Sequence, residues 1–243
     1  MTKQRLDVAL TQRKLTSSRS QSENWIKLGK VTVNGQVVSK PGHFVGSDAD
    51  VKITAEVQYV SRAGLKLASV AEVLNLNFRD KIALDVGSST GGFTDYALKH
   101  NAKKVYAVDV GTDQMHPTLR HNKSIELHEK TDIRDFYMKV IPDIVVMDVS
   151  FISLREILPH IYNYLSNANT QVVAMVKPQF EAGKGQTNKG IIKNDAMRRQ
   201  ILKDFEDWSR DYFVILNKRD SDVAGAKGNQ ERFYLLKPLD KKA

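Results

Sequence analysis

The chain has 243 residues, of which 41% are hydrophobic and 27% charged, a composition typical of a folded protein with one or two domains. Because it contains no cysteine, disulfide scaffolds, Cys-ligated metal sites and thiol nucleophiles are excluded. The start of the chain lacks the apolar segment of a signal peptide, and the longest apolar runs are far shorter than the roughly 20 residues of a membrane span. We therefore expect a cytoplasmic protein without a membrane partner, and the net charge of +9 favours a polyanionic one.

Residues 1–58 are more basic than the rest of the chain, with nine Lys or Arg against five Asp or Glu. Apolar residues at helical spacing within residues 5–28 predict two short helices, with Ser18 as the N-cap of the second and Gly29 just beyond its end. The following segment VTVNGQVV alternates around an Asn-Gly pair, the strongest short hairpin signal. The sequence thus predicts a small α+β domain, with residues 55–61 as the linker to the next one.

The remainder, residues 59–243, alternates between strand and helix patterns. Helical spacing occurs in four stretches, at 63–75, 92–100, 152–166 and 194–210. Short runs rich in Val and Ile predict strands at 82–87, 104–110, 124–129, 143–149, 171–177, 212–220 and 232–237. Such strands, separated by helices, predict an α/β domain whose mostly parallel, seven-stranded sheet is covered on both faces.

A predicted strand runs directly into the glycine-rich turn DVGSSTGG, residues 85–92, and then into a helix. Gly87 and either Gly91 or Gly92 would let a ligand approach the backbone closely. Asp109 ends the next predicted strand, which is the position of an acid that hydrogen-bonds ribose hydroxyls. A nucleotide-type ligand is therefore one interpretation of this turn, and an ordinary strand-to-helix connection is the other.

The same turn separates two candidate ligands. The sequence DVGSSTGG does not fit the G-x-G-x-x-G pattern of dinucleotide-binding turns. Asp85, at the end of the strand, would repel a pyrophosphate but could accept hydrogen bonds from the ammonium of a methionine-type ligand. The pattern therefore favours S-adenosylmethionine over NAD.

Four charged residues in separate segments form a second candidate site: Lys66, Asp148, Lys177 and Glu231. Asp148 and Lys177 come at the ends of predicted strands, at the edge where doubly wound sheets place their ligands. A lysine at the end of an apolar strand is costly to bury unless it is paired. The four charges are thus either a chemical centre or a structural ion-pair network, and the spacing alone leaves both open.

Two sets of motifs resemble known families. Residues 62–237 resemble FtsJ-type ribose 2′-O-methyltransferases, which carry a Lys-Asp-Lys-Glu tetrad whose first lysine lies in S-R-A-x-x-K-L, here SRAGLKL. Residues 5–54 resemble an S4 RNA-binding domain at Arg5-Leu6-Asp7, Leu10, Ser18-Arg19, Gly29, Val31, Val33, Asn34 and Gly35. Together with DVGSSTGGFTD, DVSFISL and VKPQFE, these segments resemble the TlyA family of ribosomal RNA methyltransferases, often labelled hemolysins.

The resemblance implies a Rossmann-like, S-adenosylmethionine-dependent methyltransferase domain joined to a small S4-like domain. It implies methyl transfer to the ribose 2′-OH of a cytidine in ribosomal RNA, with no metal required. Short chain ends are typical of the subtype that modifies only the large subunit. In the tetrad, Lys177 is the expected general base, Asp148 orients it, and Lys66 and Glu231 position the ribose and the partner lysine.

The resemblance also implies two binding surfaces. Phe151 would either pack beside the cofactor or belong to the core. The expected cofactor contacts are Asp85, Gly87, Ser88, Gly91, Gly92, Phe93, Asp109, Asp132, Ile133 and Phe151. The expected contacts with RNA phosphates are Arg5, Arg13, Lys14, Arg19, Lys27 and Lys30. The alternative for the second set is a solvated face, and the RNA surface would then lie around Lys184, Lys189 and Lys193.

Two other classes of function fit parts of the sequence. A pore-forming hemolysin would need a membrane span, a strongly amphipathic helix or an export signal, and the sequence shows none of these. A non-catalytic RNA-binding protein on a methyltransferase fold is disfavoured by the intact tetrad and glycine turn. A methyl-transfer assay separates that class from an enzyme.

Overall fold

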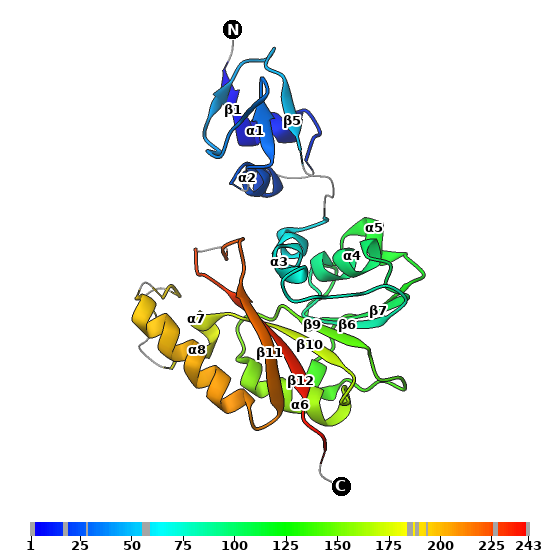
Figure 1. Ribbon diagram of the computed structural model, residues 1–243. Coiled ribbons are helices and arrows are strands. Elements are labelled where there is room, and N and C mark those ends of the chain that lie inside the picture. Colours follow the sequence, from blue (N-terminus) through cyan, green and yellow to red (C-terminus); the bar gives the residue numbers. More distant parts are fainter. Residues whose placement is uncertain are drawn as a thin grey trace. The chain divides into compact units, whose positions relative to one another are not determined.

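The structure is a computed structural model that describes residues 3–16, 19–27, 29–54, 59–183, 187, 190–192, 194–225 and 228–241. The chain divides into two compact units, Met1–Arg62 and Ala63–Ala243 (Figure 1). Several residues of the sequence predictions lie outside the described residues: Ser18, residues 55–58 of the linker, Lys184, Lys189 and Lys193.

The N-terminal unit combines short helices with small antiparallel sheets. Asn34 and Gly35 adopt left-handed φ angles of 51° and 79° and connect two paired strands, which confirms the predicted two-residue hairpin. Gly29, with φ of 66°, follows the second helix as predicted, and its N–H donates to the carbonyl of Ile26. The pairing of the two-residue strands Gln4–Arg5 and Phe44–Val45 was not predicted, because strands this short show no alternation. The elements are β1 (Gln4–Arg5), α1 (Leu6–Gln12), α2 (Arg19–Lys27), β2 (Val31–Val33), β3 (Gln36–Val37), β4 (Phe44–Val45) and β5 (Val51–Ile53), with strand orders β1-β4 and β3-β2-β5.

A buried acidic residue anchors this unit. Asp7 lies in α1 beside Leu6 and is as completely buried as that leucine and Ile26 of α2. Arg5 donates hydrogen bonds of 3.0 Å to both carboxylate oxygens of Asp7, and Arg19 donates another of 2.7 Å. The bonds from Arg5 are the main reason that the pKa of Asp7 is lowered to about 2, with Arg19 adding to them against the opposing effect of burial.

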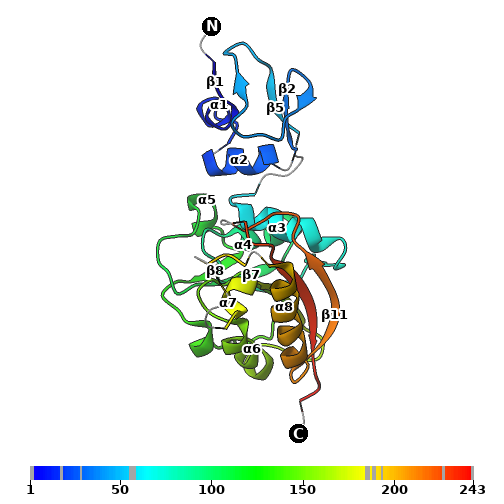
Figure 2. The same ribbon diagram turned by 90° about the vertical axis from the view of Figure 1, so that its left-hand side faces the viewer.

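The C-terminal unit is built on a seven-stranded sheet, as predicted, and its strand order is β11-β12-β10-β9-β6-β7-β8 (Figures 1 and 2). Strands β10, β9, β6, β7 and β8 are parallel to one another, whereas β12 pairs antiparallel with β10, and β11 pairs antiparallel with β12. The strands are β6 (Ile82–Val86), β7 (Lys104–Val108), β8 (Ile125–His128), β9 (Ile144–Met147), β10 (Gln171–Val176), β11 (Phe213–Asp220) and β12 (Arg232–Pro238).

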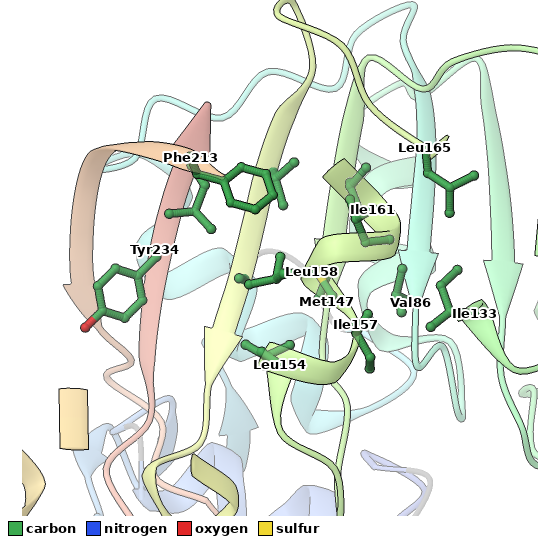
Figure 3. Close-up of a cluster of buried hydrophobic side chains, with 14 of the residues drawn as sticks. Val86, Ile133, Met147, Leu154, Ile157, Leu158, Ile161, Leu165, Phe213 and Tyr234 are labelled. Atoms are coloured by element: carbon green, nitrogen blue, oxygen red, sulfur yellow. The ribbon is translucent and has the colours of Figure 1, made fainter. Parts of the chain in front are cut away.

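Helices cover both faces of this sheet. One face contributes Met147 and Tyr234 to a core that is completed by Leu158 and other residues of α6 and α8 (Figure 3). Phe233 points to the opposite face, because side chains alternate along a strand, and its ring lies 6.1 Å from that of Phe93 in α4. The helices are α3 (Arg62–Ala71), α4 (Gly92–Lys99), α5 (Pro117–Arg120), η1 (Ile133–Asp135), η2 (Leu154–Glu156), α6 (Leu158–Tyr164), α7 (Pro178–Glu181) and α8 (Asp195–Ser209).

The predicted helix over residues 152–166 is two pieces, η2 and α6. Pro159 lies in the first turn of α6, where its missing N–H is tolerated, whereas inside one continuous helix it would remove a hydrogen bond. The four-residue helices α5 and α7 were not predicted, because a single turn shows no periodicity. Among the described residues, no helix is long and apolar enough to cross a membrane.

Replacing Asp7 by Asn should destabilise the N-terminal unit by roughly 2 kcal/mol at pH 7, because two arginines lose their charged acceptor. Since the pKa of Asp7 is about 2 in the folded state and higher in the unfolded state, the penalty should be constant above about pH 5 and shrink as the pH falls towards 2. Urea unfolding followed by Trp25 fluorescence in a Trp208→Phe background measures it. Asp50→Asn, which breaks an exposed ion pair with Lys52, is the control. Equal penalties for both variants, or a pH-independent one, would contradict this role.

Candidate active site

The register of the sheet brings four strand ends to one edge. Strand β10 pairs with β12 on one side and β9 on the other, and β9 also pairs with β6. Lys177 follows β10, Asp148 follows β9, Gly87 follows β6 and Glu231 precedes β12. Because parallel strands align their carboxyl ends and β12 runs in the opposite direction, these four residues meet along one edge of the sheet.

The predicted tetrad forms two buried ion pairs. Lys177 Nζ lies 2.6 Å from Asp148 Oδ1 in an ion pair and donates a hydrogen bond of 2.7 Å to Ser150 Oγ. Lys66 Nζ, from α3, lies 2.5 Å from Glu231 Oε2. The four charged side chains are between 3% and 15% exposed, so each depends on its partner, because an unpaired buried charge is costly. No pattern in the sequence indicated Ser150, whose Oγ accepts a hydrogen bond from the Lys177 amine that also pairs with Asp148.

A cavity of about 430 Å³ opens at the carboxyl ends of β6, β7 and β9, with Asp148 in its wall. The predicted cofactor residues that line it are Gly87, Asp109, Asp132, Ile133 and Phe151. The sequence prediction missed several others, among them Gly111, Gln114, Thr131 and Val149, because residues beyond the strand ends follow no period. No group of three or more His, Asp or Glu that could hold a metal ion occurs in the described part of the chain.

Gly87 and Gly91 are required for packing, and the expectation that they let a ligand approach the backbone stays a prediction. A Cβ on Gly87, whose φ is 78°, would lie 2.8 Å from the carbonyl oxygen of Asp148. A Cβ on Gly91, whose φ is 87°, would lie 2.5 Å from the sulfur of Met115 and 2.6 Å from a methyl of Leu119. The left-handed backbone at both positions also favours glycine. Of the two, only Gly87 reaches the cavity.

Four further predicted cofactor residues lie outside the cavity lining: Asp85, Ser88, Gly92 and Phe93. Ser88 and Gly92 are buried in the turn and at the start of α4, and their contacts with a cofactor stay predictions. Phe93 is 2% exposed and packs against Phe233, so its side chain belongs to the core. The physical reason is the direction of α4, which starts at the turn and aims this ring at the sheet.

Two carboxylates at the cavity are fixed by backbone amides. Asp109 accepts hydrogen bonds from the N–H of Ser89 at 2.8 Å and of Gly111 at 2.7 Å. Asp132 accepts one from the N–H of Arg134 at 2.9 Å and forms an ion pair with that side chain, and these interactions lower the pKa of Asp132. Both acids therefore reach the cavity in defined orientations.

Asp85 is a buried acid with a free oxygen. Thr94 donates a hydrogen bond of 2.6 Å to its Oδ2, whereas its Oδ1 has no hydrogen-bond partner among the described residues. Burial is the main reason that the pKa of Asp85 is raised to about 7, and the nearby Asp148 and Asp109 raise it further. A cation placed beside Oδ1 would supply the partner that this carboxylate lacks.

Phe151 is exposed, which excludes the core alternative. Its side chain is 92% exposed, its backbone is left-handed with φ of 67°, and its ring lies 5.3 Å from that of Phe180. Left-handed backbone is unfavourable for a bulky residue and is concentrated at functional sites. The ring therefore stands at the cavity, open to a flat ligand, and its contact with the cofactor stays a prediction.

The residues predicted to contact RNA divide by residue type. Arg5 and Arg19 hold the buried Asp7, and Arg13 donates hydrogen bonds to the carbonyls of three residues in the loop 46–49. These three arginines already have partners within the protein, so their expected role as phosphate ligands is limited to the donors that those partners leave unoccupied. The lysines, by contrast, are exposed and have no acidic partner among the described residues: Lys14, Lys27 and Lys30.

A mostly parallel sheet with an antiparallel last pair, and a cavity at the carboxyl ends of its central strands, define the chain as a Rossmann-like methyltransferase with a separate N-terminal unit. The sequence profile of the FtsJ-like methyltransferases matches residues 59–237, and that of the S4 domain matches residues 4–51. The chain therefore belongs to the FtsJ-like methyltransferase family, in the TlyA group that also carries an S4 domain.

Curated relatives cover most of the chain. Hemolysin A of Brachyspira hyodysenteriae is 41% identical over 93% of this chain and 97% of the relative. The 23S rRNA (cytidine-2′-O)-methyltransferase TlyA of Campylobacter jejuni is 40% identical over 72% and 70%, respectively. The 16S/23S rRNA (cytidine-2′-O)-methyltransferase TlyA of Mycobacterium tuberculosis is 33% identical over 96% and 89%. A solved structure from Streptococcus thermophilus, labelled a hemolysin, is 36% identical, covers 99% of this chain and 90% of its own, and has a TM-score of 0.74.

Gly87→Ala should cost roughly 2–4 kcal/mol of stability in the C-terminal unit, because the new Cβ would both strain the backbone and meet a main-chain oxygen that cannot yield. Gly228→Ala is the matched control, since φ there is 88° and nothing lies within 4 Å of the added carbon. It should cost about 1 kcal/mol, the strain alone. Urea unfolding followed by Trp208 fluorescence in a Trp25→Phe background compares the two. Equal losses would show that the contact between Gly87 and Asp148 is not tight.

Proposed function

We propose that this enzyme transfers a methyl group from S-adenosylmethionine to the ribose 2′-OH of a cytidine in ribosomal RNA of the large subunit. The observation that carries the proposal is the buried Lys177–Asp148 pair, of which Asp148 lines the cavity. The names of the Campylobacter and Mycobacterium relatives state this reaction, on 23S rRNA in the first and on both 16S and 23S rRNA in the second. We favour the large subunit alone, because the Campylobacter relative is 40% identical and the Mycobacterium relative 33%.

The residues around the cavity fit the cofactor. Asp85 would hold the ammonium with its free Oδ1, Asp109 the ribose hydroxyls, and Ile133 and Asp132 the adenine. A dinucleotide fits less well, because its pyrophosphate would meet these carboxylates. When bound, S-adenosylmethionine supplies a methyl group on a sulfonium, which is already a good leaving group.

The residues of this chain would activate the ribose 2′-oxygen by removing its proton. A ribose hydroxyl is almost fully protonated at neutral pH, so it needs a base that removes its proton as the new bond forms. Lys177 is the proposed base, acting as the neutral amine, which takes the ribose proton and becomes the ammonium that pairs with Asp148, and Asp148 and Ser150 fix the position of its Nζ. Glu231 is engaged by Lys66, which leaves Asp148 as the acid that holds Lys177. We assign Lys66 and Glu231 to positioning the ribose, which is worth several kcal/mol of a barrier.

We propose that residues 1–58 form the RNA-binding domain and residues 59–243 the methyltransferase domain. The support is the S4 match and the three exposed lysines that no described acid neutralises. Lysines of this kind bind phosphates as point charges and position RNA without reading its sequence. Such a substrate implies that the enzyme works in the cytoplasm.

Lys177→Ala should lower methyl transfer at least 100-fold, because general bases contribute about that much or more, while cofactor affinity stays within severalfold. Tritiated-methyl transfer to purified large and small ribosomal subunits from cells lacking the modification measures the first, and calorimetry the second. Lys218→Ala, which removes a lysine paired with Glu206, is the control and should keep full activity.

Four outcomes would contradict the proposal. Near-wild-type turnover of Lys177→Ala would remove this lysine from the mechanism. Tight binding of NAD with none of S-adenosylmethionine would overturn the cofactor, and methylation of the small subunit would overturn the preference for the large one. A wild-type enzyme that binds RNA and cofactor but transfers no methyl group would be a binding protein.

Replacing Lys14, Lys27 and Lys30 together by Gln should weaken RNA binding and flatten its salt dependence, by about 0.9 in the log–log slope for each phosphate that the protein no longer neutralises. Cofactor affinity should stay unchanged. Lys52→Gln is the control, because Asp50 already neutralises that charge at 2.7 Å. Filter binding at several salt concentrations measures the slopes. A slope that is the same in the triple variant and the wild type would move the RNA surface elsewhere.

A further inference from the structure

We propose that Glu181 is a positioning residue for the Lys177–Asp148 pair, because its buried carboxylate ties the helix after β10 to the loop after β9. This inference rests on the proposed function of that pair. Glu181 does not line the cavity, so it acts on the site through the two segments that it joins.

Glu181 links these two segments through a side chain that is 1% exposed. Ser153 Oγ donates a hydrogen bond of 2.6 Å to its Oε2, and the N–H of Leu154 donates one of 2.7 Å to its Oε1. Ser153 Oγ in turn accepts from the N–H of Arg155 and caps η2. Both oxygens of Glu181 are thus bound to the start of η2, the segment that follows the Asp148 loop.

A second tie joins the same two segments nearer the sheet. Lys177 Nζ is bound to both Asp148 and Ser150. Glu181 lies one helical turn beyond Lys177, so the segments after β9 and β10 are linked at two points, with the ring contact of Phe151 and Phe180 between them. One link would let the segments rotate about it, whereas two links fix the direction from which Asp148 and Ser150 approach the amine.

The chemistry of Glu181 also favours a specific role over simple packing. Burial raises the pKa of Glu181, and the nearest cation, Arg155 Nε, is 3.8 Å away from it. An apolar residue would fill the same volume without this desolvation cost. What the carboxylate adds is direction, since its two oxygens accept from two donors that no apolar side chain could hold.

The test compares Glu181→Ala and Glu181→Gln in the full chain. Glu181→Ala should lower kcat at least 10-fold while the KM for ribosomal subunits and the Kd for S-adenosylmethionine stay within threefold. Glu181→Gln should recover kcat to within threefold, because its amide oxygen still accepts from Leu154. Ser153→Ala, which removes one donor and keeps the carboxylate, should lie between them and is available if Glu181→Ala does not fold.

Glu206→Ala is the matched control. Glu206 is also a largely buried acid of the C-terminal unit, and it accepts from Tyr234 and Lys218 away from the cavity lining. The Glu206→Ala variant should be less stable than the wild type but keep its kcat. An NMR readout separates positioning from stability: the ¹³Cε signal of Lys177, identified as the lysine signal missing in Lys177→Arg, should shift in Glu181→Ala and stay unchanged in Glu206→Ala.

The inference is overturned if Glu181→Ala keeps wild-type kcat, if both alanine variants lose kcat equally, or if the Lys177 signal does not move. These outcomes differ from failure of the proposed function. If the wild-type enzyme transfers no methyl group but the Lys177 signal still shifts in Glu181→Ala, the proposed function is wrong, whereas the positioning of Lys177 by Glu181 is supported.

Discussion

Parallel pairing of β10, β9 and β6 is the constraint on which the site depends. In a parallel ladder the strands end at the same edge, so residues from distant segments of the chain arrive together. Antiparallel β12 then brings Glu231 to this edge by its amino end. The cavity follows from the same geometry, because the turns that leave parallel strands diverge towards opposite faces of the sheet and leave a crevice between them.

Buried charge is what makes this edge both specific and rigid. Removing a charge from water costs several kcal/mol, so Lys177 and Lys66 are stable where they are only because Asp148 and Glu231 face them. In the proposed mechanism, structural pairing and chemistry are therefore not alternatives, because the pairs that keep the lysines in the fold also hold them for reaction. The main-chain contact between Gly87 and Asp148 fixes one side of this arrangement.

The N-terminal unit uses its basic residues in two ways for a physical reason. Arginine presents several donors in a rigid fork, which suits it to bind Asp7 and the carbonyls of a loop. Lysine is a flexible point charge that stays hydrated, which suits an exposed phosphate-binding surface. A count of positive charges in the sequence therefore overstates the charge that is free for RNA.

Local sequence patterns were sufficient to predict the strands, the main helices and the Asn34-Gly35 hairpin, whereas the tetrad was expected from the family resemblance. Those features depend on local periodicity, on backbone angles that only a few residue types adopt, and on motifs that are contiguous in the chain. By contrast, contacts between distant segments were needed to establish that a side chain at Gly91 would collide with Met115 and that Arg19 donates a hydrogen bond to Asp7. They were also needed to establish that Phe151 is exposed, that Ser150 accepts a hydrogen bond from Lys177, and that Glu181 accepts one from Ser153. These outcomes depend on which side chains meet in three dimensions, and a partner that is distant in sequence leaves no periodic or local signal.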